Sequence, residues 1–202
     1  MYLIKNTEDD ADRMAHGRLR YEVYVEEKQW VDPKNLPDTY ERDDWDDQST
    51  LVIAYDLIGD PVACLRVIHQ GVLPLPVELS PFDVKVSVDR PCAEISRLIV
   101  RREHRGNELL LAGLFRQATQ IISDSSIEDV YAIVERPLFV LLKYMGFPFV
   151  AMGDLVESYG GFNLPARGRL SEVAQSINSR RPKYTKLYSS RFDGWIDAEM
   201  CQ

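Results

Sequence analysis

The stretch Ala93-Glu94-Ile95-Ser96-Arg97-Leu98-Ile99-Val100 has the apolar character of a buried strand, yet it carries a carboxylate and a guanidinium three positions apart. Strand side chains alternate between two faces, so Glu94 and Arg97 should lie on opposite faces unless a bulge separates them. Charges in a core are costly unless they are paired, so we expect partners from elsewhere in the chain. The upstream candidates are Arg20, Asp43, Asp46 and Arg66.

Strands and helices alternate around this stretch. The residue patterns predict helices over 9–27, 108–123, 137–145 and 171–179, and strands over 50–55, 61–68, 94–100, 129–134 and 147–152. The first two strands should form a hairpin, and the alternation after residue 94 implies a βαβ arrangement. We expect one α/β domain over 1–202, with an N-terminal helix and lid (1–48), a core (49–152) and a C-terminal elaboration (153–202).

Composition narrows the class of protein. With 202 residues and 45% hydrophobic content the chain suits one globular domain, and no apolar run approaches the roughly 20 residues of a membrane helix. The N-terminus turns acidic at once, which argues against a secretory signal. Cys64, Cys92 and Cys201 lack metal-ligand spacing and are expected to be reduced thiols of a cytoplasmic protein. A net charge of −8 argues against nucleic acid as the main partner.

Arg66 strengthens the expectation of a buried ion network, because it too is embedded in an apolar strand, Cys64-Leu65-Arg66-Val67-Ile68. Such a network can be purely structural, or it can position a general base. Glu94 is the candidate base, since a carboxylate shielded from water has a raised pKa and can accept a proton from an amine.

An ordered set of residues resembles a known signature. The set consists of Arg20, Tyr24, Trp30, Glu41-x-Asp43-x-Trp45-Asp46, Arg66 and Glu94-Ile-Ser-Arg97. It resembles that of the acyl-homoserine-lactone synthases and their relatives, the N-acyl amino acid synthases, which have a GNAT-like acyltransferase fold. This fold is a twisted mixed sheet flanked by helices. Tyr24 stands where the lactone synthases usually have Phe, and Trp45 where they have Phe or Tyr.

Two features favour the N-acyl amino acid synthase branch, which includes long-chain N-acyl tyrosine synthases. One is the extended segment 31–38 before Glu41, and the other is the run 93–100 followed directly by Arg101-Arg-Glu-His-Arg-Gly106. A lactone synthase using S-adenosylmethionine is the alternative. A non-catalytic module that binds acyl carrier protein or lipid within a GNAT-like shell is a second.

The turn after the strand resembles the site where GNAT enzymes hold the coenzyme A pyrophosphate. Glu108 stands where a second small residue is usual, so the turn suits a donor with one phosphate, the 4′-phosphopantetheine of acyl carrier protein. Glu108 can also have a purely structural role, because a negative charge at the start of a helix stabilises it. The expected donor-binding residues are Arg101, Arg102, His104, Arg105 and Gly106, with a second basic group at Arg180, Arg181, Lys183 and Lys186.

The resemblance implies transfer of a long fatty acyl chain from acyl carrier protein to the amino group of an amino acid, possibly tyrosine. No permanently bound cofactor, metal or membrane insertion is expected. Glu94 would take the amine proton, while backbone N–H groups near Leu98 and Val100 would stabilise the oxyanion. The acyl tail would run between the sheet and the helix at 138–142. Tyr24 and Trp30 would line the reaction centre, and the support would come from Arg20, Asp43, Asp46, Arg66 and Arg97.

Overall fold

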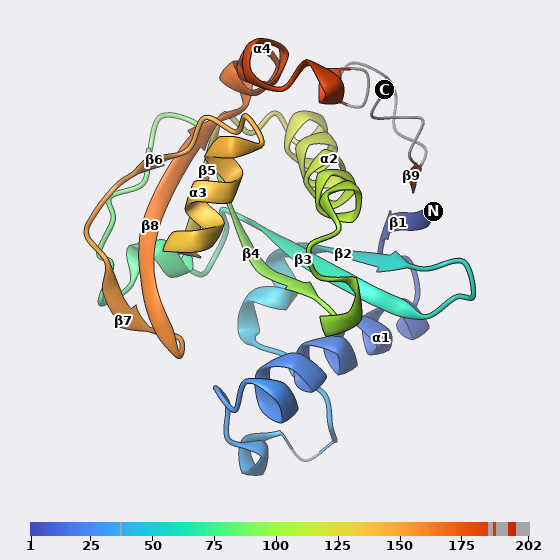
Figure 1. The fold of residues 1–202 in the computed structure, drawn as a ribbon. Helices are drawn as coiled ribbons and strands as arrows, with labels where there is room; N and C mark the ends of the chain where they lie inside the picture. Colours follow the sequence, from blue (N-terminus) through green and yellow to red (C-terminus); the bar gives the residue numbers. More distant parts are fainter. Residues whose placement is uncertain (37, 186–187, 189–193, 197–202) are drawn as a thin grey trace.

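The computed structural model describes residues 1–36, 38–185, 188 and 194–196. A mixed sheet of strand order β6-β8-β5-β4-β3-β2-β1-β9, with β7 added beside β8, runs through the molecule (Figure 1). The strands are β1 (Tyr2–Asn6), β2 (Ser49–Tyr55), β3 (Pro61–His69), β4 (Cys92–Val100), β5 (Asp129–Glu135), β6 (Val150–Ala151), β7 (Val156–Ser158), β8 (Gly161–Arg169) and β9 (Trp195–Ile196). The α-helices are α1 (Asp10–Tyr21), α2 (Glu108–Asp124), α3 (Arg136–Tyr144) and α4 (Leu170–Arg180).

The predicted hairpin and βαβ unit are both present. β2 and β3 pair antiparallel, and β4 pairs antiparallel with β3. β4 and β5 are parallel and are connected by α2, which is the predicted crossover. The GNAT-like α/β architecture expected from the sequence is therefore confirmed.

Helices cover the sheet on two faces. α2, α3 and α4 contact one face, where the largest apolar cluster includes Leu65, Leu114 and Phe115. α1 packs on β2, β3 and β4 from the other face (Figure 1), where Leu19 and Val23 meet Cys64 and Ile99. Among the described residues, no helix combines the length and the apolar character that crossing a bilayer requires.

The C-terminal part of the chain contributes more to the sheet than the sequence indicated. β8 pairs with the whole length of β5 through its residues 163–169 and also carries β6 and β7, so this strand extends the core sheet beyond residue 152. β8 contains Gly161, Pro165 and Gly168, which have poor strand propensity, and tertiary pairing overrides that local signal. The strand predicted over 147–152 is shortened to Val150–Ala151.

The first helix changes its winding before it ends. Asp9 caps α1 by accepting a hydrogen bond from the Asp12 N–H at 2.8 Å. From Glu22 to Glu27 the chain continues as a π-helical segment, η1, which lies within the predicted helix 9–27. Wider π turns are uncommon and often mark functional segments. This one carries Tyr24 toward the centre of the fold.

A bulge in β4 aligns its two charged residues. The β3–β4 register shifts between Cys64 and Arg66, and Arg97 has a positive φ of 53°. The extra residue resets the alternation, so Arg97 joins Glu94 and Ser96 on the face toward α1. Glu94 and Arg97 therefore lie on the same face of β4 in spite of their odd spacing, because a bulge separates them.

Candidate functional site

A cavity of about 470 Å³ lies where β4 and β5 part. The two strands pair only from Cys92↔Asp129 to Ile95↔Ala132, and beyond that point both line the cavity. Its wall is polar on the α1 face of the sheet and apolar on the face covered by α2 and α3. A cavity passing through a sheet in this way can hold a polar reactant on one side and an apolar chain on the other.

Three arginines and three carboxylates meet beside the polar half of the cavity. Arg20 pairs with Glu41 and, through Nη1, with Asp46 at 2.9 Å. Arg66 pairs with Asp43 and, at 2.6 Å, with Asp46. Arg97 Nη2 donates to Glu41 at 3.1 Å and to Asp43 at 2.8 Å. The predicted network of Arg20, Asp43, Asp46, Arg66 and Arg97 is therefore present, and Glu41 completes it.

The network is balanced in formal charge; Arg20, Arg66, Glu41 and Asp46 are buried, and Arg97 and Asp43 are partly buried. Arg20 and Arg66 have side-chain exposures of 0% and 1%, so their charges depend on the paired carboxylates for solvation. Burial raises the pKa of Asp46, but the guanidinium groups of Arg20 and Arg66 outweigh it and leave that pKa below its usual value. Burial lowers the pKa of Arg20, and Glu41 and Asp46 more than reverse this.

The acidic segment is shaped by the same carboxylates that bind the arginines. Asp43 begins the 3-10 helix η3 (Asp44–Gln48) and accepts a hydrogen bond from the Trp45 N–H at 3.1 Å. Asp46 accepts in return from the Asp43 N–H at 3.4 Å. This reciprocal capping box stabilises the conformation of the loop independently of the ion pairs with the arginines. Each carboxylate thus has a local and a long-range role.

Glu94 lies apart from the network, which corrects the expectation that it forms one end of it. Among the described residues it has no ion-pair partner; its Oε2 accepts a hydrogen bond from the Val77 N–H at 2.8 Å. Val77 belongs to the 3-10 turn η4 (Pro76–Glu78) in the connection between β3 and β4. Burial raises the pKa of Glu94 to about 8, only partly offset by the Val77 hydrogen bond and by Arg66 and Arg97. A carboxylate with this pKa suits proton transfer near neutral pH.

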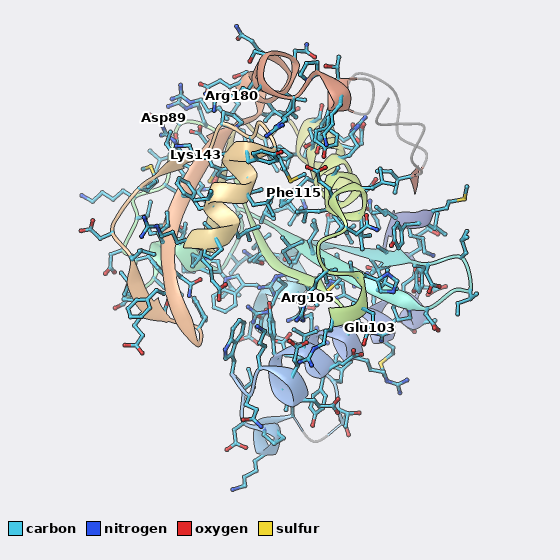
Figure 2. All side chains as sticks on the ribbon, in the orientation of Figure 1. Asp89, Glu103, Arg105, Phe115, Lys143 and Arg180 are labelled. Atoms are coloured by element: carbon cyan, nitrogen blue, oxygen red, sulfur yellow. The ribbon has the colours of Figure 1, made fainter. Side chains whose placement is uncertain are left out.

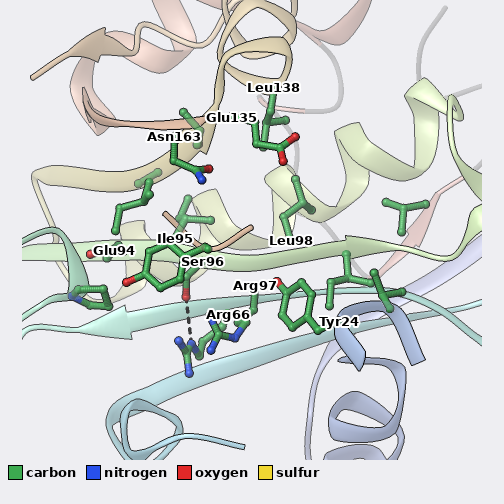
Figure 3. A pocket seen from close by; sticks show the side chains of 18 of the residues that line it. Tyr24, Arg66, Glu94, Ile95, Ser96, Arg97, Leu98, Glu135, Leu138 and Asn163 are labelled. Carbon is green, nitrogen blue, oxygen red and sulfur yellow. Dashed lines mark hydrogen bonds between the residues drawn. The ribbon is translucent and has the colours of Figure 1, made fainter. Parts of the chain in front are cut away.

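Figure 3 shows how these groups share the cavity wall. Ser96 accepts a hydrogen bond from Arg66 Nε at 3.0 Å, the dashed line in the figure. Arg97 lies between Arg66 and Tyr24, with its guanidinium 5.4 Å from the centre of the Tyr24 ring. Glu94 lines the cavity together with Ser96 and Arg97. The bulged strand therefore presents a base candidate and a fixed cation to the same space.

Backbone geometry places the Leu98 and Val100 amides at the open edge of β4. The Arg101 N–H donates to the Val62 carbonyl at 2.8 Å, toward β3. Successive strand N–H groups alternate between edges, so the Leu98 and Val100 N–H groups point away from β3. They lie past Ile95, the last β4 residue in register with β5. Both residues line the cavity, so their N–H groups lie at the strand edge that borders it.

Tyr24 and Trp30, which were expected to line the reaction centre, both line the cavity. Their rings are 5.7 Å apart, and the Trp30 indole lies against Gly160 in the β7–β8 turn. A Cβ on Gly160 would come within 2.1 Å of the Trp30 ring, and Gly160 has a φ of 77°. Only glycine suits that turn, because it adopts this backbone freely and leaves room for the indole. The N-terminal segment thus contacts the β7–β8 turn across the cavity.

The basic residues of the turn after β4 form ion pairs and hydrogen bonds within the chain, so the basic cluster seen in the sequence is partly neutralised. Arg101 makes two hydrogen bonds to Glu22 at 3.0 and 2.7 Å, and Arg105 makes two to Glu27 at 2.7 and 2.6 Å. Arg102 Nη2 is 3.6 Å from Glu27, with 70% of its side chain exposed. His104 Nδ1 lies 3.3 Å from the Tyr2 hydroxyl, and Gly106 has a φ of 79°. Figure 2 shows Arg105 and Glu103 on this turn.

Two members of the second basic group, Arg181 and Lys183, also have partners within the chain. Lys183 pairs with Glu108 at 2.6 Å, and the Arg181 guanidinium lies 3.3 Å from the centre of the Tyr144 ring. Because Lys183 neutralises Glu108, the carboxylate no longer argues by its charge against a pyrophosphate at this turn. Lys186 lies outside the described residues.

The apolar half of the cavity matches the predicted position of an acyl tail in part. Leu138 and Leu142 of α3 line it, together with Leu111 and Phe115 of α2 and Phe149. Leu138 and Glu135 face the cavity from the side opposite Arg97 (Figure 3). The intervening residues 139–141 do not line it; Val140 is 59% exposed.

Several polar cavity or network residues were not predicted, and they include Glu41, Lys28, Tyr159, Asn163 and Glu135. Glu41 belongs to the quoted signature, and its spacing of two from Asp43 in extended backbone could have placed both carboxylates on one side. Tyr159 and Asn163 come from the β7–β8 hairpin, and Glu135 ends β5. Because β8 was not recognised, no sequence signal brought this hairpin to the cavity.

The two described cysteines, Cys64 and Cys92, are free thiols in the core. Cys201 lies outside the described residues. Within the described part of the chain no three histidine, cysteine or acidic side chains cluster as metal ligands. The polar groups that the cavity offers include a buried carboxylate, a neutral ion network and backbone amides.

Comparison with known proteins identifies this arrangement. Curated protein sequences gave no match. The fold is similar to that of TofI in a ternary complex with an inhibitor and MTA (TM-score 0.72, 16% identity, covering 88% of this chain and 96% of that one). It is also similar to BjaI, a CoA-dependent acyl-homoserine lactone synthase (0.70, 21%, 89% and 89%).

The structure of FeeM, an N-acyl amino acid synthase from uncultured soil microbes, is similar as well (TM-score 0.69, 14% identity, covering 87% of this chain and 94% of that one). The sequence profile of the N-acyl amino acid synthase FeeM matches residues 15–167, which contain the whole ion network, Glu94 and the cavity wall. The chain therefore belongs to the FeeM family of N-acyl amino acid synthases and is an acyltransferase.

Proposed function

We propose that the protein transfers a long-chain fatty acyl group from acyl carrier protein to the amino group of an amino acid. The observation that carries this proposal is the cavity through the sheet, with a buried carboxylate of raised pKa on its polar wall and aliphatic side chains on its apolar wall. An amphiphilic product needs both environments within one site.

The amine enters on the α1 face and the acyl chain lies between α2 and α3. The amine nitrogen attacks the thioester carbonyl, forming the C–N bond while the N–H proton passes to Glu94. The Leu98 and Val100 amides donate to the oxyanion. The C–S bond then breaks, and the leaving thiolate takes up one proton, so that the amide and a free thiol result. The ion network holds the lid and β4 in register as a positioning framework.

The donor is proposed to be acyl carrier protein, whose 4′-phosphopantetheine arm would enter past Gly106 and the start of α2. Arg102 supports this, because its exposed side chain lies on the turn that follows β4, the strand that lines the cavity. Arg101, Arg105 and His104 have partners within the chain, so they shape the turn and add less to the docking charge. No permanently bound cofactor is proposed.

One experiment separates this function from its competitors. The purified protein is incubated with acyl carrier protein thioester or with acyl-CoA, and with single amino acids, tyrosine among them, or with S-adenosylmethionine, and products are read by mass spectrometry. An N-acyl amino acid formed from the carrier thioester is the expected product. An acyl-homoserine lactone would replace the acceptor assignment, and donor binding without any product would overturn the enzyme assignment.

The donor surface has its own test. Arg102→Glu should weaken binding of acyl carrier protein severalfold without changing the turnover of a short acyl-pantetheine thioester. Unchanged carrier affinity would remove this surface from the proposal.

A further inference from the structure

A second, smaller cavity of about 30 Å³ lies directly beyond the apolar end of the first. Ile95, Phe115 and Phe149 line both cavities, so these three side chains form the wall between them. The second cavity continues beneath α2 toward α4, where Thr119, Ile122 and Val173 line it. The apolar half of the first cavity therefore ends at these three side chains, and the second cavity lies behind them.

Close packing fixes the two aromatic rings of this partition. Phe115, on α2 (Figure 2), is 4% exposed and packs on Phe147 with ring centres 5.0 Å apart. Phe149 is 6% exposed and lies against Gly168 of β8, where a Cβ would be 3.5 Å from two ring atoms. Rings packed this closely cannot swing aside at small cost. The partition is thus a rigid stop.

We propose that Phe115 and Phe149 set the maximum length of the acyl chain, and that the cavity behind them is reserve space which a smaller side chain would open. This inference rests on the proposed function, since it assigns the apolar end of that same site. An acyl chain gains affinity with each methylene that it buries until its terminal methyl group meets the partition. A longer chain must leave carbons in water or displace the rings.

The test measures binding of N-acyl amino acids that form a graded series of saturated chain lengths, by calorimetry, to native protein and variants. Phe149→Ala joins the two cavities, and Phe149→Leu is a milder second variant in case the first does not fold. Val173→Ala is the matched control, because Val173 of α4 lines the second cavity but not the first, and its truncation enlarges that space without removing a side chain of the partition or the Phe147 ring that packs on Phe115.

The native protein should bind progressively longer chains more tightly and then reach an optimum. In Phe149→Ala the optimum should move to longer chains, and each added methylene should tighten binding about fourfold until the joined cavity is filled. Val173→Ala should keep the native optimum. The length profile of products formed from mixed acyl donors should shift in the same direction.

The outcomes distinguish this inference from the proposed function. If Phe149→Ala and Phe149→Leu fold, bind the amphiphiles and keep the native optimum, the partition is not the stop, and the proposed function is untouched. The same conclusion follows if Val173→Ala shifts the optimum as much as Phe149→Ala. If the native protein binds none of the series at any length, the acyl site itself and the inference built on it are both wrong.

Discussion

Replacing Glu94 by glutamine tests the chemistry and the energetics of the site together. The glutamine side chain would mimic the protonated acid, and its amide oxygen can keep the hydrogen bond from the Val77 N–H. It cannot accept a proton from an amine. Loss of a general base typically costs about 10²- to 10⁴-fold in rate. We expect a loss of this size in thiol release from an acyl thioester, with the variant still folded.

The same substitution should change the dependence of stability on pH. Burial raises the pKa of Glu94 from 4.5 to about 8, so between these values the folded protein holds a proton that the unfolded chain has released. Stability therefore falls as pH rises from 4.5 and levels off above 8. The interval corresponds to at most roughly 5 kcal/mol. Glu94→Gln removes this fall, so its advantage over the native protein should grow toward alkaline pH.

Urea unfolding at several pH values and pH–rate profiles measure the two effects. The native rate should rise with pH through about 8, and the variant should retain only the titration of the acceptor amine. Glu78→Gln is the control, since Glu78 caps the Leu75 N–H at 2.7 Å and does not line the cavity. Near-normal turnover of Glu94→Gln, or unfolding free energies that run parallel at all pH values, would refute the reasoning.

Three further predictions concern the surrounding structure. Arg66→Ala leaves Asp43 and Asp46 short of a buried partner and should lower the free energy of unfolding by about 3–5 kcal/mol in urea titrations; a loss below about 1 kcal/mol would contradict this. Gly160→Ala should displace the Trp30 indole. We expect KM for the acceptor to rise in steady-state kinetics, while thermal unfolding shows that the variant remains folded. The pKa of Asp46 is lowered, so its contribution to stability is present above about pH 4 and lost as pH falls further; Asp46→Asn should flatten this acid limb.

The sequence predicted the ion network because buried charge is expensive wherever it occurs. Arg66 and Arg97 stand in strands that are otherwise apolar, which demands partners irrespective of the fold's details. The carboxylates that pair with these arginines lie in one short acidic segment. Asp43 and Asp46 were predicted as partners, and Glu41 was not. Glu94 has no arginine partner among the described residues and instead accepts a hydrogen bond from the Val77 backbone N–H. Nothing in the sequence indicated that Val77 would be the donor.

For the turn after β4, the sequence showed the charges but not their partners. Its arginines form an evident basic cluster in sequence, and the cluster is real, but Glu22 and Glu27 of η1 neutralise much of it. Those glutamates are 79 and 78 residues away from Arg101 and Arg105 in the chain. Surface charges on a helix are normally solvated, so only the placement of η1 beside the turn reveals the pairing.

The sequence by itself therefore determined the strand–helix order through the core, the need for paired charges on β3 and β4, and the family signature, because each is a local or compositional constraint. Tertiary structure decided which groups share the cavity. Strand register determines the bulge at Arg97, the pairing of β8 with β5 and the point where β4 separates from β5. Register depends on contacts between segments far apart in the chain, and so the cavity and its partition could be seen only in the folded protein.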